Sequence, residues 1–88
     1  MLHPVEIYTK KYCPYCRRAK ELLRIKETAF VEYAIDDDAP RAAEMVERSG
    51  RQTVPAIFIA NRCVGSCAEL FELDESGELD RLLLLSCE

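Results

Sequence analysis

Two cysteines separated by two residues, in the stretch Cys13-Pro14-Tyr15-Cys16, constrain this chain more than any other feature of its sequence. A short apolar run over 5–8 leads into the pair, and a segment with helical periodicity follows it. If a helix begins at Cys13, that residue can be exposed while Cys16 falls inside the first turn. Pro14 then takes the first helical position, where its missing N–H costs no hydrogen bond. This junction suits a redox-active dithiol.

The composition favours one globular domain spanning residues 1–88. A hydrophobic content of 49% and a charged content of 32% are typical of a folded protein rather than a disordered segment. No run approaches the roughly 18 apolar residues of a membrane span, and the start of the chain lacks the pattern of a signal peptide. We therefore expect a cytoplasmic protein, in which a Cys-x-x-Cys pair indicates catalysis or metal binding.

The charge distribution argues against a nucleic acid as partner, because the net charge is −4. Four basic residues nevertheless surround the cysteine pair, namely Lys10, Lys11, Arg17 and Arg18. An acidic protein with a locally basic site suits a small anionic ligand better than a polyanion. The cysteines number five, and an odd count argues against a fully paired disulfide framework.

Hydrophobic periodicity predicts the order strand, helix, strand, helix, strand, strand, helix, helix. We expect strands at 5–8, 30–35, 56–59 and 63–65. We expect helices from 13 onward, from 38 to about 48, from 67 to 73 and from 78 to 85. The helical connection predicts that the first two strands are parallel, and the tight turn predicts that the last two are antiparallel. The chain is thus expected to be an α/β protein with a four-stranded mixed sheet flanked by helices.

Several finer expectations concern the second helix and the ends of helices. Asp38 should cap the second helix and Gly50 should end it in a left-handed conformation. Ala43 and Val46 should face the core, with Met45 beside them. The acidic run over 36–38 is interpreted as a solvated loop rather than a metal site. Ser76 is expected to cap the last helix.

The chemistry of the cysteine pair follows from its position. Thiolate, not thiol, is the nucleophile in disulfide exchange. Free N–H groups and the helix dipole would stabilise a thiolate on Cys13, and Lys10 and Lys11 would add to this effect. Cys16 would be less exposed and is placed to attack a mixed disulfide on Cys13. Two free core cysteines would leave Pro14 and the basic neighbours without a role, so we prefer a catalytic dithiol.

With these residues the chain resembles the dithiol glutaredoxins, and most of all the small bacterial-type members. The resemblance rests on the cysteine pair, the leading stretch 5–10, the Thr53-Val54-Pro55 segment and the Gly65 turn before a helix. It implies a thioredoxin-like fold and a glutathione-dependent thiol-disulfide oxidoreductase, with glutathione as reductant and no metal. The resemblance also implies that the protein is a monomer. Its implied partners are glutathione and proteins that contain disulfides or are glutathionylated, with ribonucleotide reductase as one client.

The resemblance also implies a groove for glutathione. A cis peptide bond before Pro55 would expose the backbone of Val54, along which the tripeptide would lie antiparallel. The glycine carboxylate would meet Lys10 and Arg51, and the γ-glutamyl carboxylate would meet the start of the helix after Gly65. The implied glutathione-binding residues are Lys10, Tyr15, Arg51, Thr53, Val54, Pro55, Gly65, Ser66, Cys67 and Ala68.

The far end of this groove departs from the family pattern of two glycines, a variable residue and two acids. Ala68 stands in place of the first acid and Ser66 in place of the second glycine. Ser66-x-x-Glu69 also reads as a capping box, so that the helix would compete with the ligand for the same N–H groups. We expect glutathione to bind more weakly here than in a relative with both acids. Cys67 is interpreted either as a partly activated thiol or as a small packing residue.

Other interpretations use the same cysteines differently. Cys13, Cys16, Cys63 and Cys67 could supply four thiolates to zinc, or a dimer could bind an iron–sulfur cluster through Cys13 and glutathione. A third alternative is a thioredoxin-like reductase served by a flavoprotein. Cys63 is otherwise expected at the core or at a sheet edge, and Cys87 in a terminal tail.

Overall fold

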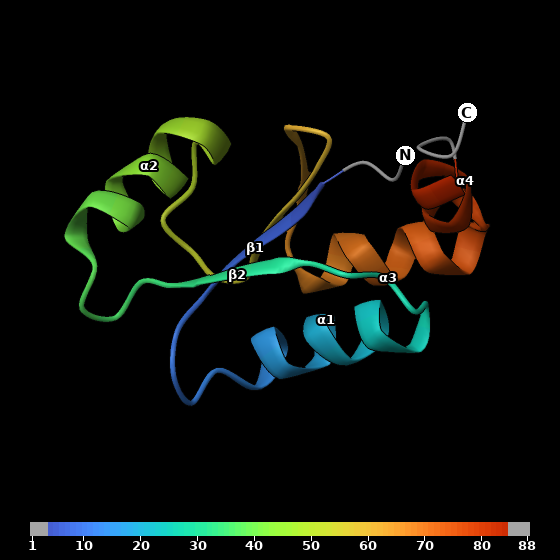
Figure 1. The fold of residues 1–88 in the computed structure, drawn as a ribbon, viewed down its shortest axis with the longest axis horizontal. Coiled ribbons are helices and arrows are strands. Elements are labelled where there is room, and N and C mark those ends of the chain that lie inside the picture. The colour runs from blue at the N-terminus through green and yellow to red at the C-terminus, as the bar shows by residue number, and fades with distance from the viewer. Residues whose placement is uncertain (1–3, 85–88) are drawn as a thin grey trace.

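The computed structural model describes residues 4–84, which form a four-stranded sheet with helices on both faces (Figure 1). The strands are β1 Val5–Thr9, β2 Val31–Ala34, β3 Ala56–Ile59 and β4 Arg62–Gly65. The helices are α1 Pro14–Ile25, α2 Ala39–Ser49, α3 Cys67–Ser76 and α4 Glu78–Leu84. The strand order is β2-β1-β3-β4, with β1 and β2 parallel and the other two pairs antiparallel. The predicted element order and mixed sheet are confirmed.

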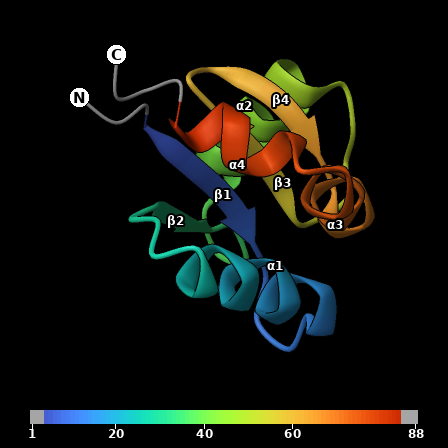
Figure 2. The same cartoon turned by 90° about the vertical axis from the view of Figure 1, so that its right-hand side faces the viewer.

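The two faces of the sheet bury separate hydrophobic clusters. Val5 and Ile7 of β1 point to the face covered by α1, α3 and α4, where Leu23, Leu70 and Leu79 complete the core. Figures 1 and 2 show α1 and α3 side by side on this face, with α2 on the opposite side of the sheet. Strand β3 is buried along its whole length, as its continuous apolar sequence predicts. Within residues 4–84, no helix is long and apolar enough to cross a membrane.

The cap residues of the helices agree largely with the sequence. The Asp38 carboxylate accepts the N–H of Arg41 at 3.1 Å, and Gly50 ends α2 with a φ of 73°. Ser76 belongs to the end of α3 rather than preceding α4 as a separate cap. Its hydroxyl still accepts the N–H of Glu78, at 3.3 Å, so the expected contact with the last helix is present.

The expected inward face of α2 is wrong for Ala43 and Val46 and confirmed for Met45. Ala43 and Val46 are exposed, and Met45 is the buried apolar residue, with 1% of its surface accessible. The helix turns a different face to the sheet than the one expected from its apolar residues, because polar side chains on its inner side bind groups on the sheet. A pattern that counts Glu44 and Arg48 as solvent-facing therefore assigns the wrong stripe to the core.

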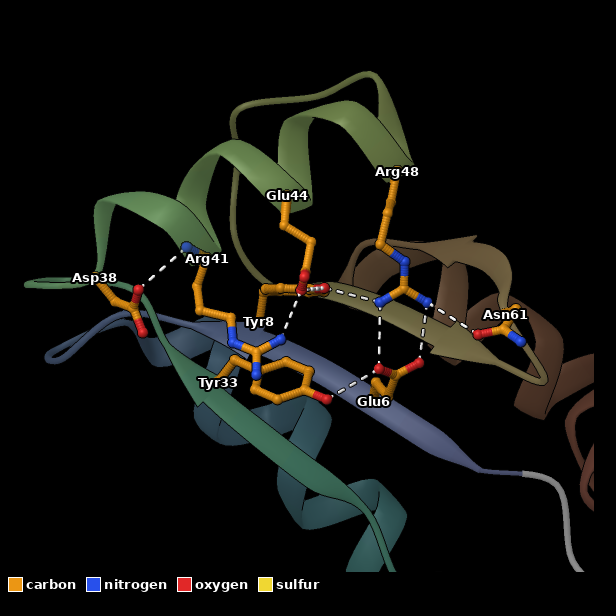
Figure 3. Close-up of polar contacts among 8 residues, drawn as sticks. All are labelled: Glu6, Tyr8, Tyr33, Asp38, Arg41, Glu44, Arg48 and Asn61. Atoms are coloured by element: carbon orange, nitrogen blue, oxygen red, sulfur yellow. Dashed lines mark hydrogen bonds and ion pairs between the residues drawn. The ribbon is translucent and has the colours of Figure 1, made fainter.

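A network of polar contacts joins α2 to the sheet (Figure 3). The Arg48 guanidinium donates to both carboxylate oxygens of Glu6, at 2.9 and 3.2 Å, and the Tyr33 hydroxyl donates to Glu6 at 3.0 Å. Arg48 also donates to the Tyr8 hydroxyl at 2.8 Å, and that hydroxyl donates to Glu44. The bond from Arg48 holds the pKa of Glu6 below its ordinary value, against the opposing effect of burial. These contacts satisfy the polar groups that α2 and β1 bury together.

Replacing Glu6 with Gln is expected to lower the free energy of unfolding at neutral pH by about 2 kcal/mol, because a charge-assisted pair is lost. Folding lowers the pKa of Glu6, so its contribution is present above the unfolded value of 4.5. The contribution is lost as the pH falls through the lower folded pKa. Urea unfolding at neutral pH and at about pH 3 tests this. Exposed Glu47→Gln is the matched control, and equal stability of Glu6→Gln and wild type at neutral pH would contradict the prediction.

Candidate active site

The loop between β1 and α1 is fixed by a contact from a neighbouring strand. Both carboxylate oxygens of Asp36, which follows β2, accept the N–H of Lys11 at 3.1 Å. The next residue, Tyr12, has a φ of 59° and is 90% exposed. As expected, the run over 36–38 forms a loop in which Asp36 and Asp37 are exposed, and Asp36 and Asp38 each also accept a backbone N–H. Asp36 is thus a positioning residue that the sequence did not reveal.

Cys13 is the N-cap residue of α1, with Pro14 at the first helical position as predicted. Its sulfur accepts the backbone N–H of Cys16 at 3.3 Å, in the way that a serine or aspartate oxygen caps a helix. The Cys13 side chain is half-buried. This N–H is one of the donors at the start of α1 that have no partner within the helix.

Cys16 lies in a different environment one turn further on. Only 2% of its surface is accessible, and it packs at the base of α1. Burial, together with the hydrogen bond and charge of Cys13, raises the pKa of Cys16 to about 12. At neutral pH Cys16 is therefore a protonated thiol, and the two cysteines are chemically unequal.

A groove of about 460 Å³ lies between the Val54-Pro55 segment and the start of α3. The peptide bond between Val54 and Pro55 is cis, as expected from the resemblance. The groove contains seven of the expected ligand residues, namely Tyr15, Thr53, Val54, Pro55, Ser66, Cys67 and Ala68. The fold thus brings together side chains from α1, the loop before β3 and the first turn of α3.

Arg18 and Phe71 also line this groove, although the sequence analysis did not name them as ligand residues. Helical spacing could have found both. Arg18 follows Tyr15 by three residues, and Phe71 follows Cys67 by four, so each lies on the same helix face as a residue already assigned to the groove. Phe71 is also one of the exposed large apolar side chains.

Lys10 lies in a second, smaller hollow of about 160 Å³ beside the cysteine pair. This hollow is lined by Thr9, Lys10, Lys11, Tyr12, Cys13, Cys16, Arg17, Lys20, Glu32 and Ala34. Lys20 is paired with Glu32 at 3.0 Å, whereas Lys10, Lys11 and Arg17 are exposed. The structure therefore places Lys10 in the same hollow as Cys13 and outside the set of residues that line the groove.

Arg51 and Gly65 do not line the groove, and both lie against the side chain of Glu69 instead. The Arg51 guanidinium donates to both carboxylate oxygens of Glu69, at 2.5 and 3.4 Å. The same carboxylate accepts the N–H of Ser66 at 3.1 Å, which is the expected reach of a capping box. Gly65 has a φ of 118°, and a Cβ at this position would overlap the Glu69 carboxylate. The positive φ favours glycine at this position, and a larger residue would also have to displace the end of the Glu69 side chain.

Within residues 4–84, the two remaining cysteines, Cys63 and Cys67, do not form a metal-binding group with the others. Cys67 is 5% exposed within the hydrophobic cluster, and burial raises its pKa, which favours the packing interpretation over an activated thiol. Cys63 is exposed on β4, and Cys87 lies outside the described residues. Among residues 4–84, no group of three or more His, Cys, Asp or Glu side chains is arranged to hold a metal ion. The proposed four-thiolate zinc arrangement is therefore not formed.

The fold and the cysteine pair define a class of protein. A mixed sheet with helices on both faces, which places a half-buried and a fully buried thiol at the start of a helix, is the thioredoxin-like arrangement of a thiol-disulfide oxidoreductase. The family model for glutaredoxin matches residues 5–64. The chain belongs to the glutaredoxin family.

Individual relatives agree with this assignment. The chain is 54% identical to glutaredoxin 3 of Escherichia coli K12 over 79 residues, which cover 90% of this chain and 95% of that protein. It is 48% identical to the solution structure of glutaredoxin from Brucella melitensis, with a TM-score of 0.82 and coverage of 93% and 89%. A crystal structure of a buckwheat glutaredoxin–glutathione complex is 26% identical, with a TM-score of 0.86 and coverage of 96% and 79%.

Brief treatment of the reduced protein with iodoacetamide at neutral pH is expected to modify Cys13 well before Cys16. Burial and a raised pKa both leave Cys16 with little reactive thiolate. Peptide mass spectrometry after quenching measures the modification at each site. Exposed Cys63 serves as the reference for an accessible thiol. Modification of Cys16 as fast as Cys63 would contradict the prediction.

Proposed function

We propose that this protein is a glutathione-dependent thiol-disulfide oxidoreductase in which Cys13 is the nucleophile and Cys16 the resolving thiol. The inequality of the two cysteines carries the proposal. The Cys13 sulfur accepts an N–H at the start of α1, whereas Cys16 is buried and protonated. An oxidoreductase needs this division of roles, because one sulfur must attack while the other waits.

In the dithiol route, the Cys13 thiolate attacks one sulfur of a protein disulfide and releases the other as a thiolate. Cys16 then loses its proton and attacks the Cys13 sulfur, which frees the second protein thiol and leaves a Cys13–Cys16 disulfide. Two glutathione molecules reduce this disulfide and become one glutathione disulfide. The negative charge of Cys13, which raises the pKa of Cys16, is absent once Cys13 is in the mixed disulfide. Formation of the mixed disulfide on Cys13 therefore eases the deprotonation of Cys16.

In the monothiol route, the Cys13 thiolate attacks the glutathione sulfur of a protein–glutathione mixed disulfide. The protein leaves as a thiol, and a second glutathione attacks the Cys13 adduct to give glutathione disulfide. Cys16 takes no part in these steps. Both routes return Cys13 to its starting state, and electrons pass from glutathione to the substrate.

The groove supplies chemistry that suits a tripeptide with two carboxylates. The backbone around Val54 can pair with an extended peptide, and the first-turn N–H groups of α3 can bind an anion. The Arg18 guanidinium and the Tyr15 ring lie at the same opening. The buckwheat relative is described as a glutathione complex, which supports the same ligand class for this chain. Client proteins with disulfides, ribonucleotide reductase among them, and a cytoplasmic location for a monomer form part of the proposal.

Replacing Cys16 with Ser is expected to preserve deglutathionylation and to reduce protein disulfide reduction roughly tenfold or more, because only the second reaction needs a resolving thiol. The measurement couples glutathione disulfide formation to NADPH oxidation, with a glutathionylated peptide and a disulfide protein as separate substrates. Cys13→Ser should abolish both activities. Full retention of protein disulfide reduction by Cys16→Ser would remove the role assigned to this residue.

Restoring an acid at position 68 is expected to tighten glutathione binding about two- to fivefold, because Ala68→Asp adds a carboxylate near the γ-glutamyl ammonium. Calorimetric titration with glutathione in a Cys13→Ser background measures the change without covalent reaction. Ala68→Asn is the neutral control of the same size. An unchanged affinity in the Asp variant would count against the expected weakness of this end of the groove.

A further inference from the structure

The two segments that provide the walls of the groove are joined by an ion pair between residues that do not themselves line it. Arg51 precedes the wall that Thr53, Val54 and Pro55 provide, and Glu69 lies in the first turn of α3, which provides the other wall. The guanidinium and the carboxylate meet in two hydrogen bonds, at 2.5 and 3.4 Å. Their side chains are 51% and 38% exposed, so a ligand carboxylate arriving from solvent can reach either partner.

The carboxylate of Glu69 is held from several sides. Its Oε1 atom accepts the N–H of Ser66 at 3.1 Å and the Ser66 hydroxyl at 3.2 Å, in addition to the contact with Arg51. Gly65 leaves the space that this carboxylate fills. The Arg51 guanidinium keeps the pKa of Glu69 below its ordinary value, so the pair is charged at neutral pH. Glu69 therefore occupies the cation and one N–H donor, the two kinds of group that an anionic ligand needs here.

We propose that Glu69 is an internal competitor for anionic ligands: it holds Arg51 in the free protein, so that a ligand carboxylate gains this guanidinium only by displacing Glu69. The inference rests on the proposed glutathione function and goes beyond it by naming a residue that sets affinity. It also accounts for the position of Arg51, which is assigned to the ligand by family resemblance but lies against Glu69 in the structure. Arg51 then contributes little net affinity while Glu69 is present.

The test is a cycle of variants in a Cys13→Ser background, titrated with reduced glutathione in a calorimeter. Glu69→Gln keeps an acceptor for the Ser66 N–H, since glutamine also serves in a capping box, but it removes the charge that holds Arg51. We expect Glu69→Gln to tighten binding about two- to fivefold, which is the scale of an exposed ion pair. Arg51→Gln alone should change the affinity less than about twofold. The double variant should return to the background affinity.

Two comparisons can overturn the proposal. Unchanged or weaker binding by Glu69→Gln removes the competition, and tightening that persists in the double variant shows that Arg51 is not the group released. Glu72→Gln, an exposed residue on the same helix, removes the same charge away from the pair. Equal tightening by this control would reduce the effect to net charge and would also overturn the proposal.

Failure of the proposed function gives a different result. If no variant binds glutathione and the wild-type protein shows no glutathione-coupled activity, the glutathione function itself is wrong, and the competition falls with it. If binding is measurable but indifferent to Glu69, only the competition is wrong. Urea unfolding of each variant establishes that the compared proteins are folded, and Arg51→Gln provides an independent arm of the cycle if Glu69→Gln is unstable.

Discussion

The alternation of side chains along β1 is the constraint on which the rest of the structure depends. Val5 and Ile7 enter the core beneath α1, α3 and α4, while Glu6 and Tyr8 face α2 on the other side of the sheet. The strand pairs with β2 in parallel and with β3 in antiparallel register, so it fixes both neighbours at once. It ends directly before the loop that carries Cys13. A slip of one residue along β1 would exchange its two faces and displace Cys13.

Much of the fold could be predicted from the sequence because local patterns and tertiary packing agree. The strand at 56–59 is apolar throughout and buried throughout, and Pro14, Asp38 and Gly50 lie at the helix ends that their chemistry favours. The inner face of α2 could not be predicted in this way. Arg48 buries its charge against Glu6 and Tyr8, and a periodicity that places every charge in solvent cannot register partners on a distant strand.

The candidate site also contains some features that the sequence could predict and others that it could not. The cysteine pair and the Val54-Pro55 wall could be predicted from sequence motifs and from the family resemblance, since both depend on contiguous residues. The partner of Arg51 was not, because its carboxylate belongs to a residue eighteen positions further along the chain. Asp36 escaped for a similar reason: its partner is a backbone N–H in another loop, and no sequence pattern marks a backbone donor. Contacts between remote segments had to come from the structure.

In the proposed cycle, the hydrogen bond from the Cys16 N–H to the Cys13 sulfur would link the redox state of the cysteine pair to the stability of the first turn of α1. When Cys13 is reduced, its sulfur is free to serve as the acceptor that caps the helix. In the proposed disulfide between Cys13 and Cys16, the same sulfur carries no charge and is a weaker acceptor, so the first turn of α1 would lose part of its cap. The first turn of α1 would thus be more stable in the reduced form than in the disulfide form. A substitution that stabilises the first turn of α1 without using this sulfur would reduce the difference in helix stability between the dithiol and disulfide forms. It would therefore change the reduction potential of the cysteine pair.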